Sequence, residues 1–394
     1  MVSNDMYALG SKRSVIREIF EYAKARGAEI GPENVFDFSI GNPNVPAPDC
    51  VKEAILDLMN EADSTKIHGY TSAQGDYETR RVIADSVNRR FGAAVVPECI
   101  YMTVGAAASV TITACALYEE GDEFITFAPY FTEYKVFVKT AGAELIVVPT
   151  EKDTFQIDVD ALAAAVNPHT KGIIINSPNN PSGVVYSPES IRALCDLLRE
   201  KEAEYGHPIF LISDEPYREI VYDGVKVPYL VNEYDDTIIC YSYSKALSLP
   251  GERIGYILVS PKIRDWQRVY AAVCGAGRAL GYVCAPSLMQ KVIARCEGQT
   301  SDISIYQRNR DLLYNALSEY GYTCVHPDGA FYLFVKAPGG DAYELYERGK
   351  QYKLLLVPGD DFGAPGYVRV AYCVRTETIE RALPAFKRLI ESYR

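Results

Sequence analysis

Residues that commonly build metal centres and redox sites are few in this chain and poorly placed for either task. Its four histidines (His68, His169, His207 and His326) lie far apart, and no two of its ten cysteines are separated by only two residues. Metal sites usually draw on closely spaced ligands of these types. The sequence therefore predicts no metal centre, and the scattered cysteines indicate reduced thiols in a cytoplasmic protein.

Long apolar runs and an excess of basic residues are also missing. No segment approaches the roughly 18 apolar residues of a membrane-spanning helix, and residues 1–14 lack the apolar stretch of a signal peptide. Lys and Arg total 40 against 52 Asp and Glu, a net charge of −12. This charge disfavours general binding to nucleic acid or anionic lipid, so we expect neither as a partner.

The composition is that of a globular protein with a large core. The 394 residues include 48% apolar and 23% charged side chains, which excludes a disordered chain. The length exceeds one ordinary domain and predicts a large domain with a smaller partner.

Short apolar runs alternate with segments of helical length between Tyr70 and Ser260. Most runs are continuous, as in strands that are buried on both faces of a parallel sheet. The repeated strand-then-helix order predicts an α/β domain in which a mostly parallel seven-stranded sheet lies between helices. The expected strands are 100–104, 124–127, 144–149, 172–176, 209–213, 237–241 and 255–259.

The pattern changes beyond Pro286. A long helical stretch (288–320) precedes short strand-like runs and a C-terminal helix, which predicts a separate α+β unit. The N-terminal helix (15–26) is expected to pack with this unit. We therefore predict a large cofactor-binding domain over residues 48–287 and a small domain formed by residues 14–47 and 288–394.

Lys245 is the most informative residue of the chain. The segment Ser242-Tyr243-Ser244-Lys245 follows a run expected to be a buried strand, and Arg253 comes eight residues later. Partial burial lowers the pKa of a lysine and makes it a nucleophile that can form a Schiff base. The two serine hydroxyls and Arg253 are donors that suit a phosphate. On this segment alone, a surface lysine in a serine-rich turn remains the alternative.

Three further segments follow other expected strands. Asp214, in Ser-Asp-Glu-Pro-Tyr, lies at a strand's carboxyl end, where α/β sheets bind ligands. Asn180 lies in the turn Ser-Pro-Asn-Asn-Pro-Ser-Gly, and residues 103–109 pass from strand to helix through small side chains that leave helix amides open to a phosphate. Each segment alone is equally consistent with a solvated loop, a rigid turn or tight packing.

Taken in order, these segments resemble those of the class I/II pyridoxal-phosphate aminotransferases, the aspartate aminotransferase superfamily of fold-type I enzymes. The ordered set is a small-residue helix start, then NNPSG, SDEPY and SYSK followed by GER. It is framed by the segments SIGNP at 39–43 and YVRV at 367–370. The resemblance extends from about Val15 to Tyr393. It implies pyridoxal 5′-phosphate as cofactor and a homodimer with shared active sites.

The resemblance implies a role for each matching residue. Lys245 would form the Schiff base and move the substrate's proton, Asp214 would pair with the pyridine nitrogen, and Tyr217 with Asn180 would hydrogen-bond the phenolic oxygen. Tyr130 would stack on the ring. The phosphate would be held by Gly105, Ala106, Ala107, Ser242, Ser244 and Arg253, together with the partner subunit's Tyr70. The substrate α-carboxylate would be bound by Arg369, Asn180 and the Gly41 amide.

Two departures from the family pattern concern the substrate. The helix start carries Ala106, Ala107 and Ala108, where the family usually has a polar residue and one aspartate-specific branch has a lysine. The family's other device is an arginine from the partner subunit that binds a distal carboxylate. Arg278, 33 residues after Lys245, is the candidate, and a structural arginine at a helix end is the alternative.

The sequence therefore predicts a pyridoxal-phosphate-dependent aminotransferase that exchanges an amino group between an L-amino acid and a 2-oxo acid. The expected donors are aspartate or glutamate, and also aromatic or neutral amino acids. A pyridoxal-phosphate-dependent β-lyase of the carbon–sulfur type is the alternative, because such lyases keep the same lysine, aspartate and arginine. A cofactor-sensing regulator with a DNA-binding arm is disfavoured by the acidic charge.

Overall fold

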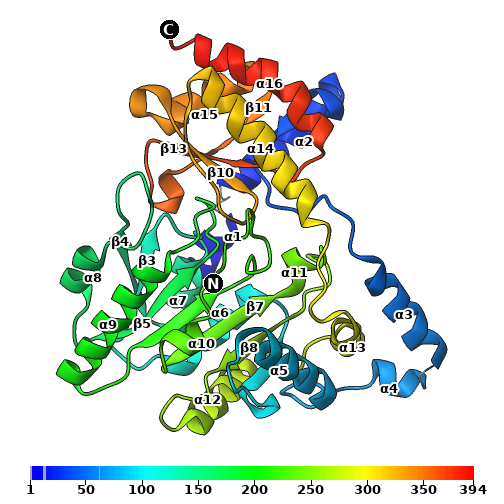
Figure 1. The fold of residues 1–394 in the computed structure, drawn as a ribbon, viewed down its shortest axis with the longest axis vertical. Helices are drawn as coiled ribbons and strands as arrows, with labels where there is room; N and C mark the ends of the chain where they lie inside the picture. The colour runs from blue at the N-terminus through cyan, green and yellow to red at the C-terminus, as the bar shows by residue number, and fades with distance from the viewer. Residues whose placement is uncertain (1, 12–14, 62) are drawn as a thin grey trace.

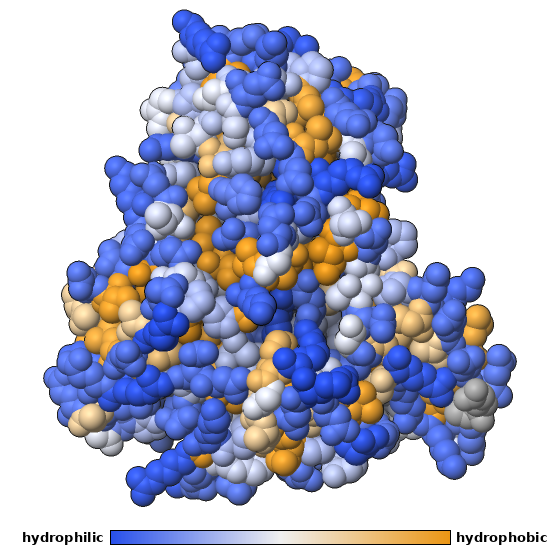
Figure 2. Space-filling model, viewed as in Figure 1, coloured by the Kyte–Doolittle hydropathy of each residue, from blue (hydrophilic) through white to orange (hydrophobic). Residues whose placement is uncertain are grey.

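The computed structural model describes residues 2–11, 15–61 and 63–394 and consists of two stacked units (Figure 1). The lower and larger unit holds the main sheet, and the upper unit holds a smaller sheet under helices near the C-terminus. Figure 2 shows a mostly polar surface on this face, with apolar surface gathered where the two units meet. None of the described helices combines the length and the apolar composition that crossing a membrane requires.

The larger unit is built on a seven-stranded sheet that is parallel except for β8, which confirms the predicted fold class. Its central strands β6 and β7 are buried along their whole length, and β5 is buried at every position except Lys171, which explains why these sequences contain continuous apolar runs. From one edge to the other the strands are β2 (Ile100–Thr103), β8 (Gly255–Val259), β7 (Thr237–Ser242), β6 (Phe210–Asp214), β5 (Thr170–Asn176), β3 (Glu123–Ala128) and β4 (Glu144–Pro149).

Helices cover both faces of this sheet, and each face has its own apolar core. One face packs against α6 (Ala106–Leu117), α7 (Tyr134–Ala141) and α12 (Trp266–Ala279). The other face packs against α3 (Asp49–Glu61), α5 (Tyr77–Phe91), α8 (Val159–Ala165), α9 (Pro188–Tyr205), α10 (Leu230–Glu233) and α13 (Ser287–Cys296). Two further helices of this unit are α4 (Ser64–His68) and α11 (Tyr243–Ala246), and α11 continues directly from β7.

The smaller unit has an antiparallel sheet in the order β12 (Val357–Pro358), β13 (Tyr367–Ala371), β10 (Tyr332–Lys336) and β9 (Thr323–Val325). Its core includes side chains of α14 (Ile303–Tyr320), α15 (Ala342–Gln351) and α16 (Thr376–Glu391). The N-terminal part joins it, because β1 (Phe36–Asp37) pairs with β11 (Leu354–Leu355) and α2 (Val15–Ile30) packs beside them. The remaining helix, α1 (Asn4–Ser11), is joined to α7 by an ion pair between Asp5 and Lys139.

The single helical stretch expected over 288–320 is wrong, because the chain forms two helices in different units. Gly298 lies between them with a φ of 83°, a left-handed conformation that glycine adopts without steric cost. Asp302 then caps α14 by accepting a hydrogen bond from the Ser304 amide at 3.0 Å. Since α13 packs on α3 and α5, we propose that the boundary between domains lies after α13 rather than at residue 288.

Candidate active site

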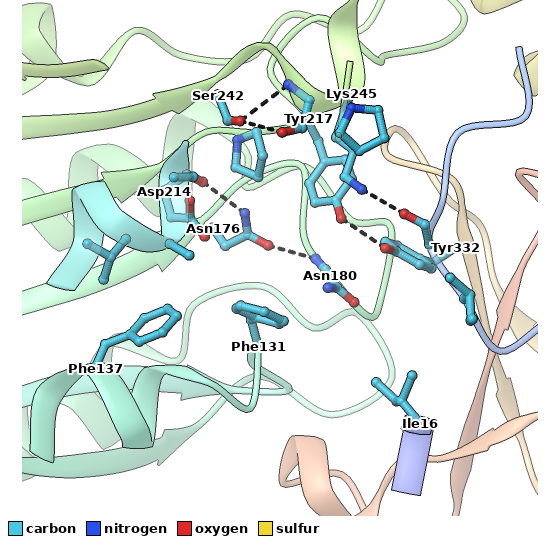
Figure 3. Close-up of a pocket in the computed structure, with 18 of the residues that line it drawn as sticks. Ile16, Phe131, Phe137, Asn176, Asn180, Asp214, Tyr217, Ser242, Lys245 and Tyr332 are labelled. Carbon is cyan, nitrogen blue, oxygen red and sulfur yellow. Dashed lines mark hydrogen bonds between the residues drawn. The ribbon is translucent and has the colours of Figure 1, made fainter. Parts of the chain in front are cut away.

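A cavity of about 310 Å³ lies at the carboxyl ends of β5, β6 and β7, where the two units meet (Figure 3). This is the edge of a parallel α/β sheet at which ligands bind. The larger unit contributes most of the wall, and α2, the segment after β1, β10 and β13 close it from the smaller unit. The predicted site residues that line it are Gly41, Ala106, Ala107, Asn180, Asp214, Tyr217, Ser242, Ser244, Lys245, Arg253 and Arg369.

Lys245 lies at one end of the cavity, in the short helix α11. Its Nζ donates a hydrogen bond to the carbonyl oxygen of Gly41 at 2.6 Å and lies 5.5 Å from the centre of the Phe331 ring. Burial lowers the pKa of Lys245 to about 8, and the charges of Arg253 and Arg369 act in the same direction. A neutral amine is therefore accessible near neutral pH, which is what a lysine nucleophile requires.

Asp214 lies at the opposite end, at the last position of β6. The Tyr134 hydroxyl donates to its Oδ2 at 2.5 Å, whereas its buried Oδ1 has no hydrogen-bond partner among the described residues. Burial raises the pKa of Asp214 to about 7, and the Tyr134 hydrogen bond opposes that rise. A buried carboxylate oxygen without a donor is costly, so this position favours a ligand that brings a cationic N–H.

A chain of hydrogen bonds fixes the wall between these two ends (Figure 3). The Asn176 side-chain amide donates to the Asp214 carbonyl oxygen at 2.8 Å, and its Oδ1 accepts from the Asn180 backbone N–H at 2.7 Å. The hydroxyls of Tyr217 and Tyr332 are 2.8 Å apart. Asn176 could have been found from the sequence, because it ends β5 beside the end of β6. Tyr332 could not, because it is one aromatic residue in an apolar strand and no local pattern distinguishes it.

Donors suited to a phosphate gather beside Lys245. The Ser242 and Ser244 hydroxyls are 2.8 Å apart, and Arg253 donates to the Ser244 hydroxyl at 3.2 Å. The first amides of α6 have no side-chain cap, because Gly105 occupies the capping position with a φ of 98°. Open amides at a helix N-terminus favour anions. Gly105 does not line the cavity, but a Cβ there would lie 2.6 Å from the Arg253 guanidinium.

Arg369, on β13, is buried without a carboxylate among its hydrogen-bond partners. Its guanidinium donates to Asn180 Oδ1 at 2.9 Å and to the Ser39 carbonyl oxygen at 2.6 Å, both neutral acceptors. Its Nε has no partner in the described part of the chain. The charge of Arg369 is therefore available to an incoming carboxylate. Gly41 must lack a side chain, because a Cβ there would lie 1.9 Å from the Tyr332 hydroxyl.

Besides Gly105, three predicted site residues do not line this chain's cavity. Tyr130 is buried beneath the wall, and its neighbour Phe131 lines the cavity across from Asn176 and Asp214 (Figure 3). Neighbouring side chains of a non-helical segment point in different directions, and the sequence Ala-Pro-Tyr-Phe did not show which ring faces the ligand. Tyr70 is 93% exposed and follows α4 at the periphery of the larger unit, and Arg278 is exposed near the end of α12.

Comparisons with known proteins agree with this geometry. A family model described as "Aminotransferase class I and II" matches residues 33–386. A crystal structure of an amino transferase from Eubacterium rectale is 57% identical with a TM-score of 0.98, covering 100% of this chain and 99% of that one. The aspartate aminotransferase of Thermus thermophilus with maleate is 27% identical with a TM-score of 0.86, covering 99% and 100%. The chain is 31% identical to a probable aspartate/prephenate aminotransferase of Thermus aquaticus, over 93% of this chain and 95% of that protein.

A relative named for a different substrate is about as similar. Aromatic-amino-acid aminotransferase 2 of Thermococcus litoralis is 29% identical over 393 residues, covering 96% of each protein.

Proposed function

Because the chain belongs to the class I and II aminotransferases, we propose that its cavity binds pyridoxal 5′-phosphate and exchanges an amino group between an L-amino acid and a 2-oxo acid. The observation that carries this proposal is a pair of groups at the two ends of one cavity, a partly buried amine and a buried carboxylate, whose charge or hydrogen-bonding capacity the surrounding protein does not fully balance. Lys245 has a lowered pKa, and Asp214 has a buried oxygen that receives no hydrogen bond from the described residues. When bound, the cofactor supplies a ring that accepts the electrons released at the substrate Cα.

The residues of the cavity fit this cofactor at each of its polar groups. Asp214 Oδ1 would accept a hydrogen bond from a protonated pyridine nitrogen, which supplies the missing donor. Tyr217 and Asn180 would bind the phenolic oxygen. Ser242, Ser244, Arg253 and the first amides of α6 would bind the phosphate. Phe131, rather than Tyr130, would stack against the ring.

Two residues act directly on the substrate in this proposal. The amine of Lys245 is the nucleophile that attaches the cofactor, and after its release it moves a proton at the substrate Cα. Arg369 would hold the α-carboxylate through its guanidinium N–H donors, and the Gly41 backbone lines the same cavity.

The rest of the cavity bears on the choice of substrate. Its described cations are Lys245, Arg253 and Arg369, and each already has a partner in the proposed reaction. The remaining wall is largely apolar and includes Ile16, Phe131 and Phe137. We therefore propose that one chain accommodates aromatic or neutral amino acids, and that aspartate or glutamate is accepted when the partner subunit's Arg278 reaches the site.

A second copy of the chain would complete the site. Tyr70 is exposed in this chain and does not line its cavity, so we propose that it contributes to a phosphate site across an interface. We propose a homodimer with shared sites. Mixing an inactive Tyr70→Phe variant with an inactive Lys245→Ala variant is expected to restore activity, because some hybrid dimers contain one intact site. Demonstrably mixed dimers without recovery would exclude Tyr70 from the partner's site.

A half-reaction screen tests the function as a whole. The protein loaded with pyridoxal phosphate is mixed with each of the twenty amino acids, and loss of the bound cofactor's absorbance is followed together with the 2-oxo acid produced. We expect stoichiometric conversion with aspartate or glutamate and with at least one aromatic amino acid. Release of pyruvate and ammonia from S-substituted cysteines, without half-transamination, would identify a β-lyase instead.

A further inference from the structure

Two segments that line the cavity, one at the end of β6 and one at the end of β7, also carry side chains that are buried but do not line the cavity. At the end of β6 and just after it, Asp214 and Tyr217 line the cavity, whereas Glu215 and Arg218 do not line it and are buried, with 2% and 6% of their surface exposed. At the end of β7 and the start of α11, Ser242 and Ser244 line the cavity, whereas Tyr243 does not. A buried arginine and glutamate outside a binding cavity need a reason, because burying charge is costly.

Arg218 lies in a box of aromatic rings. Its guanidinium forms an ion pair with Glu215 and lies 4.8 Å from the centre of the Tyr241 ring, 5.1 Å from Tyr229 and 5.6 Å from Phe91. The Phe91 and Tyr229 rings are stacked at 4.3 Å. Cation–π contacts of this kind stabilise a desolvated guanidinium. We refer to Phe91, Glu215, Arg218, Tyr229 and Tyr241 as the rear cluster.

The rear cluster connects the two segments that line the cavity. Glu215 accepts a hydrogen bond from the Ser213 hydroxyl at 2.7 Å, and its backbone N–H donates to the Cys240 carbonyl oxygen on β7 at 2.9 Å. The Tyr241 ring meets the Tyr243 ring edge-on at 5.0 Å. The Glu215–Arg218 ion pair and the Tyr241 ring therefore connect the loop after β6 with β7 and the start of α11.

We infer that the rear cluster is a positioning device for the cofactor, in which Arg218 and Glu215 fix Asp214 and Tyr217 relative to the segment that carries Ser242 and Lys245. This inference rests on the proposed cofactor site. Hydrogen bonds and ion pairs hold a geometry more strictly than apolar contacts do, and ligand sites depend on such support behind the residues that touch the ligand. Glu215 and Arg218 themselves touch neither cofactor nor substrate.

A double variant separates positioning from folding. Glu215→Gln with Arg218→Met removes both charges together, so neither is left buried without its partner. The measurements are the melting temperature of the cofactor-free protein, the dissociation constant of pyridoxal phosphate well below that temperature, and the pH titration of the bound cofactor's absorbance. We expect the dissociation constant to rise by about tenfold or more and the absorbance titration to shift, because Asp214 no longer keeps its place.

Arg218→Lys provides a second variant that keeps the charge pair but loses the flat guanidinium among the rings. It is expected to weaken cofactor binding less than the double variant. The matched control is Arg310→Met, since Arg310 is equally buried, paired with Asp223 and 4.8 Å from the Tyr222 ring, but belongs to α14. This control should lower the melting temperature and leave the dissociation constant unchanged.

The outcomes distinguish the two proposals. If the folded double variant and Arg218→Lys bind pyridoxal phosphate as wild type does, with the same absorbance titration, the rear cluster is structural and the inference is wrong. If the wild-type protein itself does not bind pyridoxal phosphate, the proposed function fails.

Discussion

Asp214 and Glu215 are neighbours in the chain and are both buried, yet they lie in opposite environments. Asp214 faces the cavity, where one of its oxygens accepts from the Tyr134 hydroxyl and the other has no donor in the part of the chain that the structure describes. Glu215 faces the rear cluster, where Arg218 and the Ser213 hydroxyl bind it. The Glu215 carboxylate is therefore paired within the protein, whereas the Asp214 carboxylate can still accept a hydrogen bond from a ligand. In this loop, the binding site is indicated by a buried carboxylate that lacks a full set of partners, and not by burial alone.

Two of the buried arginines, Arg218 and Arg369, differ in the same way. Arg218 has a carboxylate partner and three rings, whereas the hydrogen bonds of Arg369 to the described residues go to neutral acceptors. Both guanidiniums are almost fully buried. Arg218 therefore stabilises the structure without a ligand, and Arg369 gains most when a carboxylate arrives.

Among substitutions of cavity residues, replacing Lys245 should lower the rate of amino transfer the most. We expect Lys245→Ala to lower amino transfer by at least about 10³-fold, because nucleophile and proton carrier are lost together. Pyridoxal phosphate should still bind through Asp214 and the phosphate donors. Borohydride reduction followed by peptide mass spectrometry should place the pyridoxyl group on Lys245 in the wild-type protein, and an adduct on another lysine would contradict the assignment.

Replacing Arg369 should impair every substrate. We expect Arg369→Met to lower kcat/KM by about 10²-fold or more for all amino acids, since losing one partner of a desolvated charge pair costs roughly 2–5 kcal/mol. Arg278→Ala is the matched comparison. It should impair aspartate by a similar factor and leave phenylalanine unchanged; equal small effects on both substrates would make Arg278 structural.

Asp214→Asn and Glu215→Gln should change the stability of the cofactor-free protein in opposite directions. The pKa of Asp214 is raised from 3.8 to about 7, so its stabilising effect is complete below pH 3.8 and is lost as the pH rises through about 7. Above that pH the cost is on the order of 4 kcal/mol. Urea unfolding at pH 8 should therefore show Asp214→Asn to be more stable than wild type, although it binds pyridoxal phosphate more weakly.

Glu215→Gln should instead destabilise the protein by about 3–5 kcal/mol at the same pH, because it leaves the Arg218 charge buried without its partner. If both variants destabilise equally, the contrast between the two sides of the loop is wrong.

Tyr134→Phe is the mildest test. Its hydroxyl lowers the pKa of Asp214 against the larger effect of burial, so its removal should raise that pKa further. The loss of a hydrogen bond to a charged group should weaken pyridoxal phosphate binding by roughly tenfold. Tyr101→Phe removes a hydroxyl bonded at 3.2 Å to the Tyr282 carbonyl oxygen, on the same face of the sheet, and should leave the binding unchanged.

Much of the fold followed from local patterns. Continuous apolar runs bounded by turn residues predicted every strand of the large sheet, because strands buried on both faces have no polar side to alternate with. The prediction of one helical stretch over 288–320 was wrong, because α13 and α14 have similar helical composition and the sequence does not show that they pack on different units.

Which segments meet at the cavity could be inferred from the sequence, because the carboxyl ends of parallel strands share one edge and therefore bring Asn180, Asp214 and Lys245 together. Which side of each segment faces the ligand depends on the packing of the folded chain. Phe131 rather than Tyr130 lines the cavity, Tyr134 reaches Asp214 from α7, and Arg218 turns away into its rings. The physical reason is that side-chain direction in loops and at helix starts depends on packing against distant elements, which no local pattern encodes.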